Sequence, residues 1–261
     1  MKLYCIASGS SGNCLYFETG ETAVLVDAGV SSKRICNAIT EAGLRYPEAV
    51  FITHEHSDHI SGLEVFLKSH PIPVLSTKGT LSAIAATFKG TVPMNLFYKI
   101  VPGKTYTFKD LSVTAHSMPH DAADPVFYTL ESNGQKASVM TDIGALTDEL
   151  VEAGSGSNLL YLESNHDPNI LMAGSYPYSL KQRILGKFGH LSNDSAAELA
   201  VKLMNPKLHN IVLGHLSKEN NYAELAFETM RSAIESAWCF GENMPHIEVA
   251  NRDIPTGPLE I

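Results

Sequence analysis

Short apolar segments alternate along the chain with longer segments in which apolar residues recur every three to four positions. The short segments predict buried strands, and the longer ones predict amphipathic helices. We expect strands at Leu15–Thr19, Ala23–Asp27, Ala49–Thr53, Pro73–Ser76, Leu111–Ala115, Phe127–Glu131, Lys136–Thr141, Leu159–Glu163, Asn210–Leu213 and His246–Ala250. We expect helices at Ser32–Ala42, Asp58–Ser69, Thr80–Phe88, Asp194–Met204 and Tyr222–Ala237. Such an alternation is typical of an α/β protein.

Local signals refine two parts of this pattern. Glu18–Glu21 and Ser132–Gln135 predict hairpin turns, the second because it contains Asn-Gly. The helix expected at Asp58–Ser69 carries one apolar stripe, and Ser57 is a plausible cap for its first turn.

Two pairs of segments resemble each other within the chain. Leu25–Gly29 and Val139–Gly144 both read as a strand that ends in Asp-x-Gly, and Gly-His-Leu-Ser occurs at both 189–192 and 214–217. These similarities favour a single domain over residues 1–261, built from two similar halves at roughly 1–135 and 136–261.

The composition is that of a soluble globular protein, with 44% hydrophobic and 18% charged residues. The first residues do not resemble a signal peptide, and no apolar run approaches membrane-spanning length. The four cysteines are scattered without a CxxC pair, which favours reduced thiols and a cytoplasmic location.

The formal charge of −9 argues against nucleic acid as a partner, because binding to phosphates needs local lysine and arginine. One stretch nevertheless differs: no carboxylate lies between Asp167 and Asp194, whereas Lys181, Arg183 and Lys187 lie within it. This stretch is either an ordinary solvated helix face or a patch that binds anions.

The segment Thr53–His59 (Thr-His-Glu-His-Ser-Asp-His) carries the clearest chemical signal. Alternate residues of an extended segment point the same way, so His54 and His56 can approach one ion together. Asp58 and His59 come at the start of the next helix and can reach a second ion. Imidazole with carboxylate suits zinc, manganese or iron. The alternative is a surface histidine cluster that binds no metal.

Other potential ligands follow other expected strands. Asp142 ends one strand, His215 follows another across Gly214, and His120 lies just past a third. Each alone would more often be a capping or core residue. Several strand ends that together deliver histidine or aspartate are harder to explain by packing, and α/β scaffolds present their sites at such ends.

The run His54-x-His56-x-Asp58-His59, with Asp27, Asp142 and His215, resembles the metallo-β-lactamase fold superfamily over essentially the whole chain. The resemblance implies an α/β fold, a four-layer αββα sandwich. Five further motifs are similar to the bacterial WalJ/YycJ group, whose members are regarded as DNA exonucleases. They are Ser8–Cys14, His120–Pro125, Glu163–Asp167, Gly189–Asn193 and His215–Asn221.

The resemblance also implies roles for single residues. His54, His56 and His120 would hold one metal ion, Asp58, His59 and His215 would hold a second, and Asp142 would bridge the two. Asp27 would fix the metal-binding loop by hydrogen bonds. His116 competes with His120, which we favour because it begins the matching His-Asp-Ala-Ala-Asp-Pro run.

The function expected is that of a binuclear metal-dependent phosphodiesterase, a 5′–3′ DNA exonuclease. Two divalent ions about 3.5–4 Å apart can share a hydroxide at neutral pH, and that hydroxide attacks phosphorus. Asp58 would orient it. His190 is the candidate for general acid or phosphate contact, and the alternative is a histidine packed near the start of the helix at Asp194. No Gly-x-Ser-x-Gly elbow supports serine hydrolysis.

Substrate contacts are expected in three places. Ser10, Ser11 and Asn13 offer donors to a phosphate, although a plain turn explains them about as well. Asn165 and His166 follow a strand end and would line the cleft. Lys181, Arg183 and Lys187 would follow the DNA backbone while bases stack on Tyr176, Tyr178 and Phe188, unless those rings are core residues.

Three rival functions remain open at this point. A small-molecule hydrolase of the same fold, acting on esters, thioesters or cyclic phosphodiesters, would use the same site chemistry. A redox di-iron protein of this fold typically has a carboxylate where this chain has His56. A non-catalytic metal-binding protein would bind metal without turnover. No membrane or obligate protein partner is indicated.

Overall fold

The computed structural model describes residues 1–261 and divides the chain into two compact units. Unit 1 comprises Met1–Ser117, Ala122–Val126 and Asn251–Glu260, and unit 2 comprises Met118–Asp121, Phe127–Ala250 and Ile261. The units are therefore not two contiguous halves, because the C-terminal segment returns to unit 1 after unit 2 is complete.

Unit 1 contains a seven-stranded sheet in the order β14-β1-β2-β3-β4-β5-β6. Strands β14, β1, β2 and β3 pair antiparallel, and β3 to β6 pair parallel. The bounds are β1 (Lys2–Ala7), β2 (Cys14–Glu18), β3 (Ala23–Val26), β4 (Ala49–Phe51), β5 (Val74–Ser76), β6 (Phe97–Lys99) and β14 (Thr256–Glu260). Unit 1 also contains an antiparallel hairpin of β7 (Thr105–Phe108) and β8 (Leu111–Ser117).

The helices of unit 1 bury their apolar stripes against this sheet. They are α1 (Ser32–Glu41), α2 (Ser57–Ile60), α3 (Leu63–Ser69) and α4 (Lys78–Phe88), with a short 3₁₀ turn at Met94–Leu96. Ile35 and Ile39 of α1, Phe66 of α3 and Ile84 of α4 are fully buried in one cluster with strand residues such as Leu25. Burial of such side chains is the main stabilising contribution in a domain of this size.

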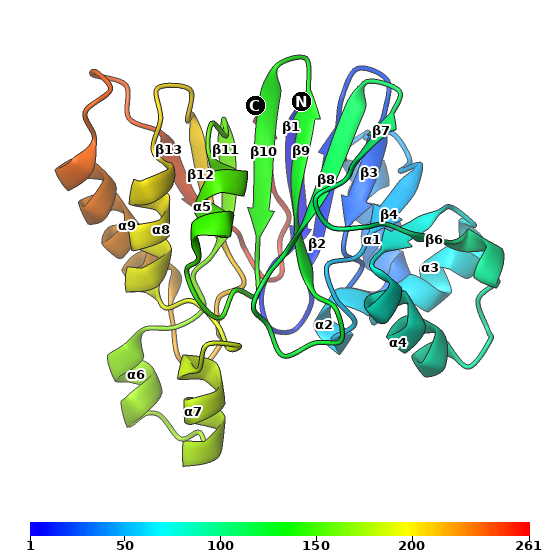
Figure 1. Ribbon diagram of the computed structural model, residues 1–261, viewed down its shortest axis with the longest axis horizontal. Helices are drawn as coiled ribbons and strands as arrows, with labels where there is room; N and C mark the ends of the chain where they lie inside the picture. Colours follow the sequence, from blue (N-terminus) through cyan, green and yellow to red (C-terminus); the bar gives the residue numbers. More distant parts are fainter. The chain divides into compact units, whose positions relative to one another are not determined.

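Unit 2 contains five neighbouring strands in the order β13-β12-β11-β10-β9. Strands β9 and β10 form an antiparallel hairpin, and β10 to β13 are parallel (Figure 1). The bounds are β9 (Val126–Ser132), β10 (Gln135–Met140), β11 (Leu159–Glu163), β12 (Asn210–Gly214) and β13 (His246–Val249). The turn between β9 and β10 has positive φ at both Asn133 and Gly134, which confirms the hairpin expected from Asn-Gly.

The helices of unit 2 form two groups. The first group packs in one core cluster with the strands; it comprises α5 (Asp148–Gly154), α8 (Asn193–Leu203) and α9 (Ala223–Ala237). The second group, α6 (Pro168–Ala173) and α7 (Tyr178–Leu185), projects beyond the carboxyl ends of the parallel strands, away from α8 and α9 (Figure 1). No helix of the structure has the length and apolar character needed to cross a membrane.

The single helix expected at Asp58–Ser69 is wrong, because α2 and α3 are separated near Gly62. Gly62 donates its N–H to the carbonyl of Ala28, and a Cβ at Gly62 would lie 1.7 Å from the carbonyl oxygen of Val30. The loop after β3 therefore occupies the space that a continuous helix with side chains would need. Ser57 is the first helical residue rather than the cap, which is His56.

The carboxyl ends of parallel strands meet at one edge of a sheet, and in both units this edge carries the polar residues singled out above. In unit 1, Asp27 follows β3 and His54 follows β4. In unit 2, Asp142 follows β10, Glu163 ends β11 and His215 follows β12. Strand register therefore gathers the polar residues of unit 2, and in unit 1 it places Asp27 beside the segment that begins with His54.

Candidate metal centre

The loop after β4 in unit 1 brings three imidazoles and one carboxylate together. His54 Nε2 lies 3.0 Å from His56 Nδ1, and the His54 and His59 ring centroids are 4.1 Å apart. His59 Nε2 lies 3.5 Å from Asp58 Oδ2. His54 and His59 have no exposed surface, whereas His56 and Asp58 are half-buried. The four side chains of this loop, His54, His56, Asp58 and His59, are called the unit 1 donors.

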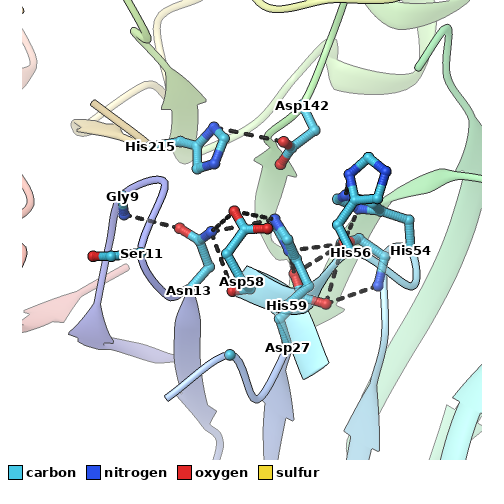
Figure 2. Close-up of polar contacts among 12 residues, drawn as sticks. Gly9, Ser11, Asn13, Asp27, His54, His56, Asp58, His59, Asp142 and His215 are labelled. Atoms are coloured by element: carbon cyan, nitrogen blue, oxygen red, sulfur yellow. Dashed lines mark hydrogen bonds and ion pairs between the residues drawn. The ribbon is translucent and has the colours of Figure 1, made fainter. Parts of the chain in front are cut away.

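Asp27 fixes one of the unit 1 donors and the loop that carries it (Figure 2). Its Oδ2 lies 2.7 Å from Nδ1 of His59, and its Oδ1 accepts the Thr53 N–H at 2.8 Å. A carboxylate at this position favours the His59 tautomer with the proton on Nδ1, which leaves the Nε2 lone pair for a metal ion. Asp27 adopts a left-handed φ of 63° to reach this position.

Asn13, which we expected to contact a phosphate, contacts two of the unit 1 donors, Asp58 and His59 (Figure 2). Its Nδ2 lies 3.3 Å from Asp58 Oδ2 and 3.2 Å from His59 Nε2, while its Oδ1 accepts the Gly9 N–H at 3.0 Å. Asn13 is 4% exposed, so a substrate has little access to it.

Gly29 must be a glycine for this loop to approach so closely. A Cβ at Gly29 would lie 1.7 Å from the carbonyl oxygen of Asp58. The Asn13 N–H donates to that same oxygen at 2.7 Å, and the Gly29 N–H donates to the Asn13 carbonyl at 2.8 Å. Three segments of unit 1 are thus locked together behind the unit 1 donors.

Ser11, the other expected phosphate contact in this region, lies on the exposed Gly-Ser loop between β1 and β2. Its Oγ accepts a hydrogen bond from Nη1 of Arg252 at 3.0 Å. Arg252 lies in the C-terminal segment that returns to unit 1, a position that sequence reasoning gave no means of connecting to Ser11.

In unit 2, four side chains from three strand ends and a loop converge. Ligand atoms of Asp142, Glu163, His190 and His215 all lie within 4.8 Å of one another. His215 Nδ1 is 3.6 Å from Asp142 Oδ1 (Figure 2). Asp142 and His215 adopt left-handed φ values of 59° and 56°. Non-glycine residues in this region are strained and are concentrated at functional sites.

Glu163 is the centre of this group and was missed as a functional residue from the sequence. Its Oε1 accepts from Nδ1 of both His190, at 2.7 Å, and His215, at 2.9 Å. Its Oε2 accepts the backbone N–H groups of Ile143 and Leu191. The signal that could have found it was its position at the end of β11, between the strands that deliver Asp142 and His215.

The charges of this group are set by burial and by proximity. Burial alone favours the neutral acid at Glu163, but the imidazoles of His190 and His215 outweigh it and hold the pKa of Glu163 below its usual value. Burial likewise opposes protonation of His190, yet the Glu163 carboxylate outweighs it, so the pKa of His190 is raised. Glu163 therefore holds the His190 ring through Nδ1 and favours its protonated form.

His120 lies in unit 2, whereas its competitor His116 lies on β8 of unit 1. The Nδ1–H of His120 points to the Gly189 carbonyl at 3.2 Å, and Nε2 lies 3.8 Å from Asp142 Oδ1. This contact leaves Nε2 as the ligand atom directed toward Asp142. The side chains His120, Asp142 and His215 are called the unit 2 donors.

Asn165 and His166 are buried supports within unit 2 rather than open surface. Asn165 is 4% exposed and its Nδ2 donates to the His215 carbonyl at 3.0 Å. His166 is 1% exposed and neither ring nitrogen has a hydrogen-bond partner. Burial lowers the pKa of His166 to about 4. The backbone carbonyls of Asn165 and His166 accept the N–H groups of Ser217 and Asn193, so both residues connect neighbouring loops.

A network of amide side chains ties these loops together. Asn193 and Asn221 exchange two hydrogen bonds of 3.0 and 2.8 Å, and Ser164 donates to Asn193 Oδ1 at 2.6 Å. These residues come from three of the motifs quoted above, Glu163–Asp167, Gly189–Asn193 and His215–Asn221. The motifs are thus spatial neighbours that build the support of one donor group.

We call the stretch without carboxylates between Asp167 and Asp194 the cationic stretch. Its basic side chains lie in different environments. Lys181 is 8% exposed, and its Nζ donates to the carbonyls of Met172 and Gly174, each at 2.7 Å. The structure therefore gives Lys181 a different role from the phosphate contact that we expected, because its ammonium joins α6 to α7. Arg183 is exposed, and its Nε donates to Oδ2 of Asp121 beside His120.

The donor chemistry of both groups fits divalent transition metals. Neutral imidazole nitrogens and carboxylate oxygens are the ligands that zinc, manganese and iron share. His59, His120 and His215 each have Nδ1 held by a carboxylate or carbonyl, the arrangement that presents Nε2 to an ion.

Comparison with known proteins agrees with this geometry. A family model described as "Beta-lactamase superfamily domain" matches residues 22–215. The chain is 39% identical over 240 residues to exodeoxyribonuclease WalJ of Streptococcus pneumoniae, covering 90% of this chain and 89% of that protein. It is 37% identical over 232 residues to exodeoxyribonuclease YycJ of Bacillus anthracis, covering 88% of each. The crystal structure of Zn²⁺-bound PqqB from Methylobacterium extorquens superposes with a TM-score of 0.72 at 16% identity, covering 98% of this chain and 100% of that one.

Proposed function

Because this chain belongs to the β-lactamase superfamily and has the α/β sandwich fold of metallo-β-lactamases, we propose that it is a metal-dependent exonuclease that degrades DNA from the 5′ end. The observation that carries the proposal is the match, over about nine-tenths of each chain, to two exodeoxyribonucleases. The donor geometry agrees, since phosphodiester hydrolysis by such enzymes needs no side-chain nucleophile.

The proposed active centre combines the unit 1 donors with the unit 2 donors. In this assignment one ion is held by His54, His56 and His120, and a second by Asp58, His59 and His215, with Asp142 shared. Support comes from the three imidazoles whose Nδ1 is held and whose Nε2 is left for an ion, and from the donor chemistry of both groups. Zinc is our first choice, with manganese or iron as alternatives.

Two bound divalent ions would lower the pKa of water and neutralise charge on the phosphate during attack. The protein supplies the remaining chemistry. In this proposal the Asp58 carboxylate, which accepts a hydrogen bond from Asn13, orients the attacking water. His190, whose pKa the Glu163 carboxylate raises, gives a proton to the leaving oxygen.

The exposed side chain of Arg183 and the segment that follows it are the proposed contacts to the DNA backbone. Ser11 with Arg252 offers a second cationic contact in unit 1. None of the four cysteines forms a disulfide bond. We propose a cytoplasmic location, because reduced thiols and a DNA substrate both favour it.

The proposal is tested by incubating metal-loaded protein with 5′-labelled single- and double-stranded DNA, matched RNA and a thioester. We expect release of labelled nucleotides from the 5′ end of DNA. Asp142→Ala should lose most of the activity, whereas His246→Ala, which removes an exposed imidazole on β13, should retain it. Thioester cleavage with inert nucleic acids would assign the chain to small-molecule hydrolysis instead. Two bound metal ions without turnover on any substrate would assign it to metal binding alone.

A further inference from the structure

Helix α7 exposes two large apolar side chains and buries a lysine together with Ile184. Tyr178 and Leu185 are 69% and 42% exposed, whereas Lys181 is buried and bonded to two carbonyls. Positions seven apart lie on one face of a helix, so Tyr178 and Leu185 share the exposed face over about 10 Å. A surface helix normally places its lysine outward and its aromatic and aliphatic residues inward.

Two further large apolar side chains are exposed on the same hairpin of helices. Met172 of α6 and Phe188, three residues past α7, are each 48% exposed. We call Met172, Tyr178, Leu185 and Phe188 the hairpin surface. Single exposed apolar residues are ordinary, but several within one small projecting element mark an interaction site.

The charge around the hairpin surface identifies what it fits. Residues 168–193 contain no carboxylate. Lys187 is exposed, and its Nζ lies 5.0 Å from the centroid of the Phe188 ring. An aromatic face beside an ammonium group, with no acid in the segment, complements a base and its phosphate. A protein partner with an apolar face would not require the absence of carboxylates.

The hairpin surface is also joined directly to the unit 2 donors. Gly189, which follows Phe188, accepts the hydrogen bond from His120, and Arg183 of α7 pairs with Asp121. His190 comes next in the chain. A strand whose phosphate lies at His120 and His190 therefore passes Phe188 within a short distance.

We propose that the hairpin surface binds unpaired bases of the substrate strand beside the phosphate being cleaved. Tyr178 and Phe188 stack on bases, and Lys187 contacts a phosphate. This inference rests on the proposed function, since it names how the same site recognises its polymer. It assigns recognition to base faces rather than base edges, so the site accepts any sequence.

The test measures binding of the metal-loaded protein to short phosphorothioate oligonucleotides, which resist hydrolysis, by fluorescence anisotropy. Tyr178→Ala and Phe188→Ala should each weaken binding about tenfold. Tyr178→Phe should restore binding, because the ring is kept. Tyr98→Ala, which removes an aromatic ring that is 52% exposed on β6 of unit 1, is the matched control and should bind normally.

Two comparisons separate stacking from a general loss of structure. An oligonucleotide with abasic positions should bind wild-type protein more weakly, and Phe188→Ala should then cause no further loss. The aromatic variants should leave the salt dependence of binding unchanged, whereas Lys187→Ala should lower its slope by about one. Equal losses on normal and abasic strands would overturn the inference.

Hydrolysis of a strand built entirely of abasic units distinguishes this inference from the proposed function. Such a strand has no bases to stack, so Tyr178→Ala and Phe188→Ala should cleave it at the wild-type rate. If wild-type protein fails to cleave it and DNA, the proposed function fails, whatever the binding data show. Normal DNA binding by both variants, together with loss of self-association in Leu185→Ala, would assign the hairpin surface to a second copy of the chain and overturn the inference.

Discussion

The donors of the two units are assembled in opposite ways. In unit 1, all four lie between His54 and His59, on the loop after β4 and the first turn of α2. In unit 2, Asp142 and His215 come from the ends of β10 and β12, and Glu163 stands between them at the end of β11. One group is contiguous in sequence, and the other exists only because parallel strands end at one edge.

The supporting residues differ in the same way. Asp27 holds a single imidazole, His59, together with the backbone of Thr53. Glu163 holds two imidazoles, His190 and His215, through one oxygen. In unit 2, one buried carboxylate therefore positions the donors. In unit 1, the same task is shared by Asp27, Asn13 and a close backbone approach at Gly29.

The largest expected effect follows from removing one carboxylate from each unit. Asp58→Ala and Asp142→Ala should each lower DNA hydrolysis by about 10³-fold, because each removes several kcal/mol of stabilisation by the metal centre. The double variant should be no worse than either single one, since residues that act as a unit are not additive. Losses that multiply, measured as kcat/KM on a labelled duplex, would show that the two groups act separately.

The pH dependence of stability should reveal the buried imidazole of unit 2. Burial lowers the pKa of His166 to about 4, below its usual value near 6.5, so the unfolded chain binds more protons between these values. The free energy of unfolding should therefore fall as pH drops from about 6.5 to 4, by about 3 kcal/mol from this residue.

Urea unfolding at several pH values measures this effect. His166→Asn removes the titrating ring and should flatten the wild-type dependence in that window. His70→Asn, which replaces a half-buried histidine of unit 1, serves as the control and should leave the dependence in place. An unaltered slope in His166→Asn would contradict the assignment.

The two supporting carboxylates should differ in how many properties they control. Asp27→Asn and Glu163→Gln should each weaken metal binding by about 10- to 100-fold. Glu163→Gln should also move the alkaline limb of the activity profile to lower pH, because the negative charge that raises the pKa of His190 is lost. Asp27→Asn should leave that limb in place. Identical pH profiles for the two variants would remove His190 from the proton transfer.

A smaller effect separates Lys181 from Lys187, the two lysines of the cationic stretch. Lys181→Met should lower the free energy of unfolding by about 1–3 kcal/mol, because two carbonyls lose a charged donor. It should leave the salt dependence of DNA binding unchanged. A reduced salt slope with unchanged stability would return Lys181 to the role of a phosphate contact.

The sequence predicted the ten strands and five helices with the strongest periodicity, and nearly all of them are present within a few residues. It missed β1, β6, β7 and β14, and the short helices α5, α6 and α7. Periodicity has little to work with in elements of three to eight residues. The break at Gly62 was missed because its cause, the backbone of Val30, comes from a distant segment.

The unit 1 donors could be read from the sequence because their spacing is local. The central place of Glu163 could not, since it depends on the parallel register of β10, β11 and β12. The left-handed conformations of Asp27, Asp142 and His215 were equally hidden, although the similarity of Leu25–Gly29 to Val139–Gly144 indicated a shared strand end. We predicted that Lys181 is exposed, but it is buried. Composition does not tell which face of a helix is buried.

We propose that donors from both units hold one pair of ions, and metal content measured by inductively coupled plasma mass spectrometry tests this proposal most directly. Wild-type protein should bind two divalent ions per chain. Asp142→Ala, a change in unit 2 alone, should abolish tight binding of both ions, and His246→Ala should bind two. Retention of one ion by Asp142→Ala, together with loss of that ion on His56→Ala, would show that the unit 1 donors bind metal on their own. This result would contradict the shared centre.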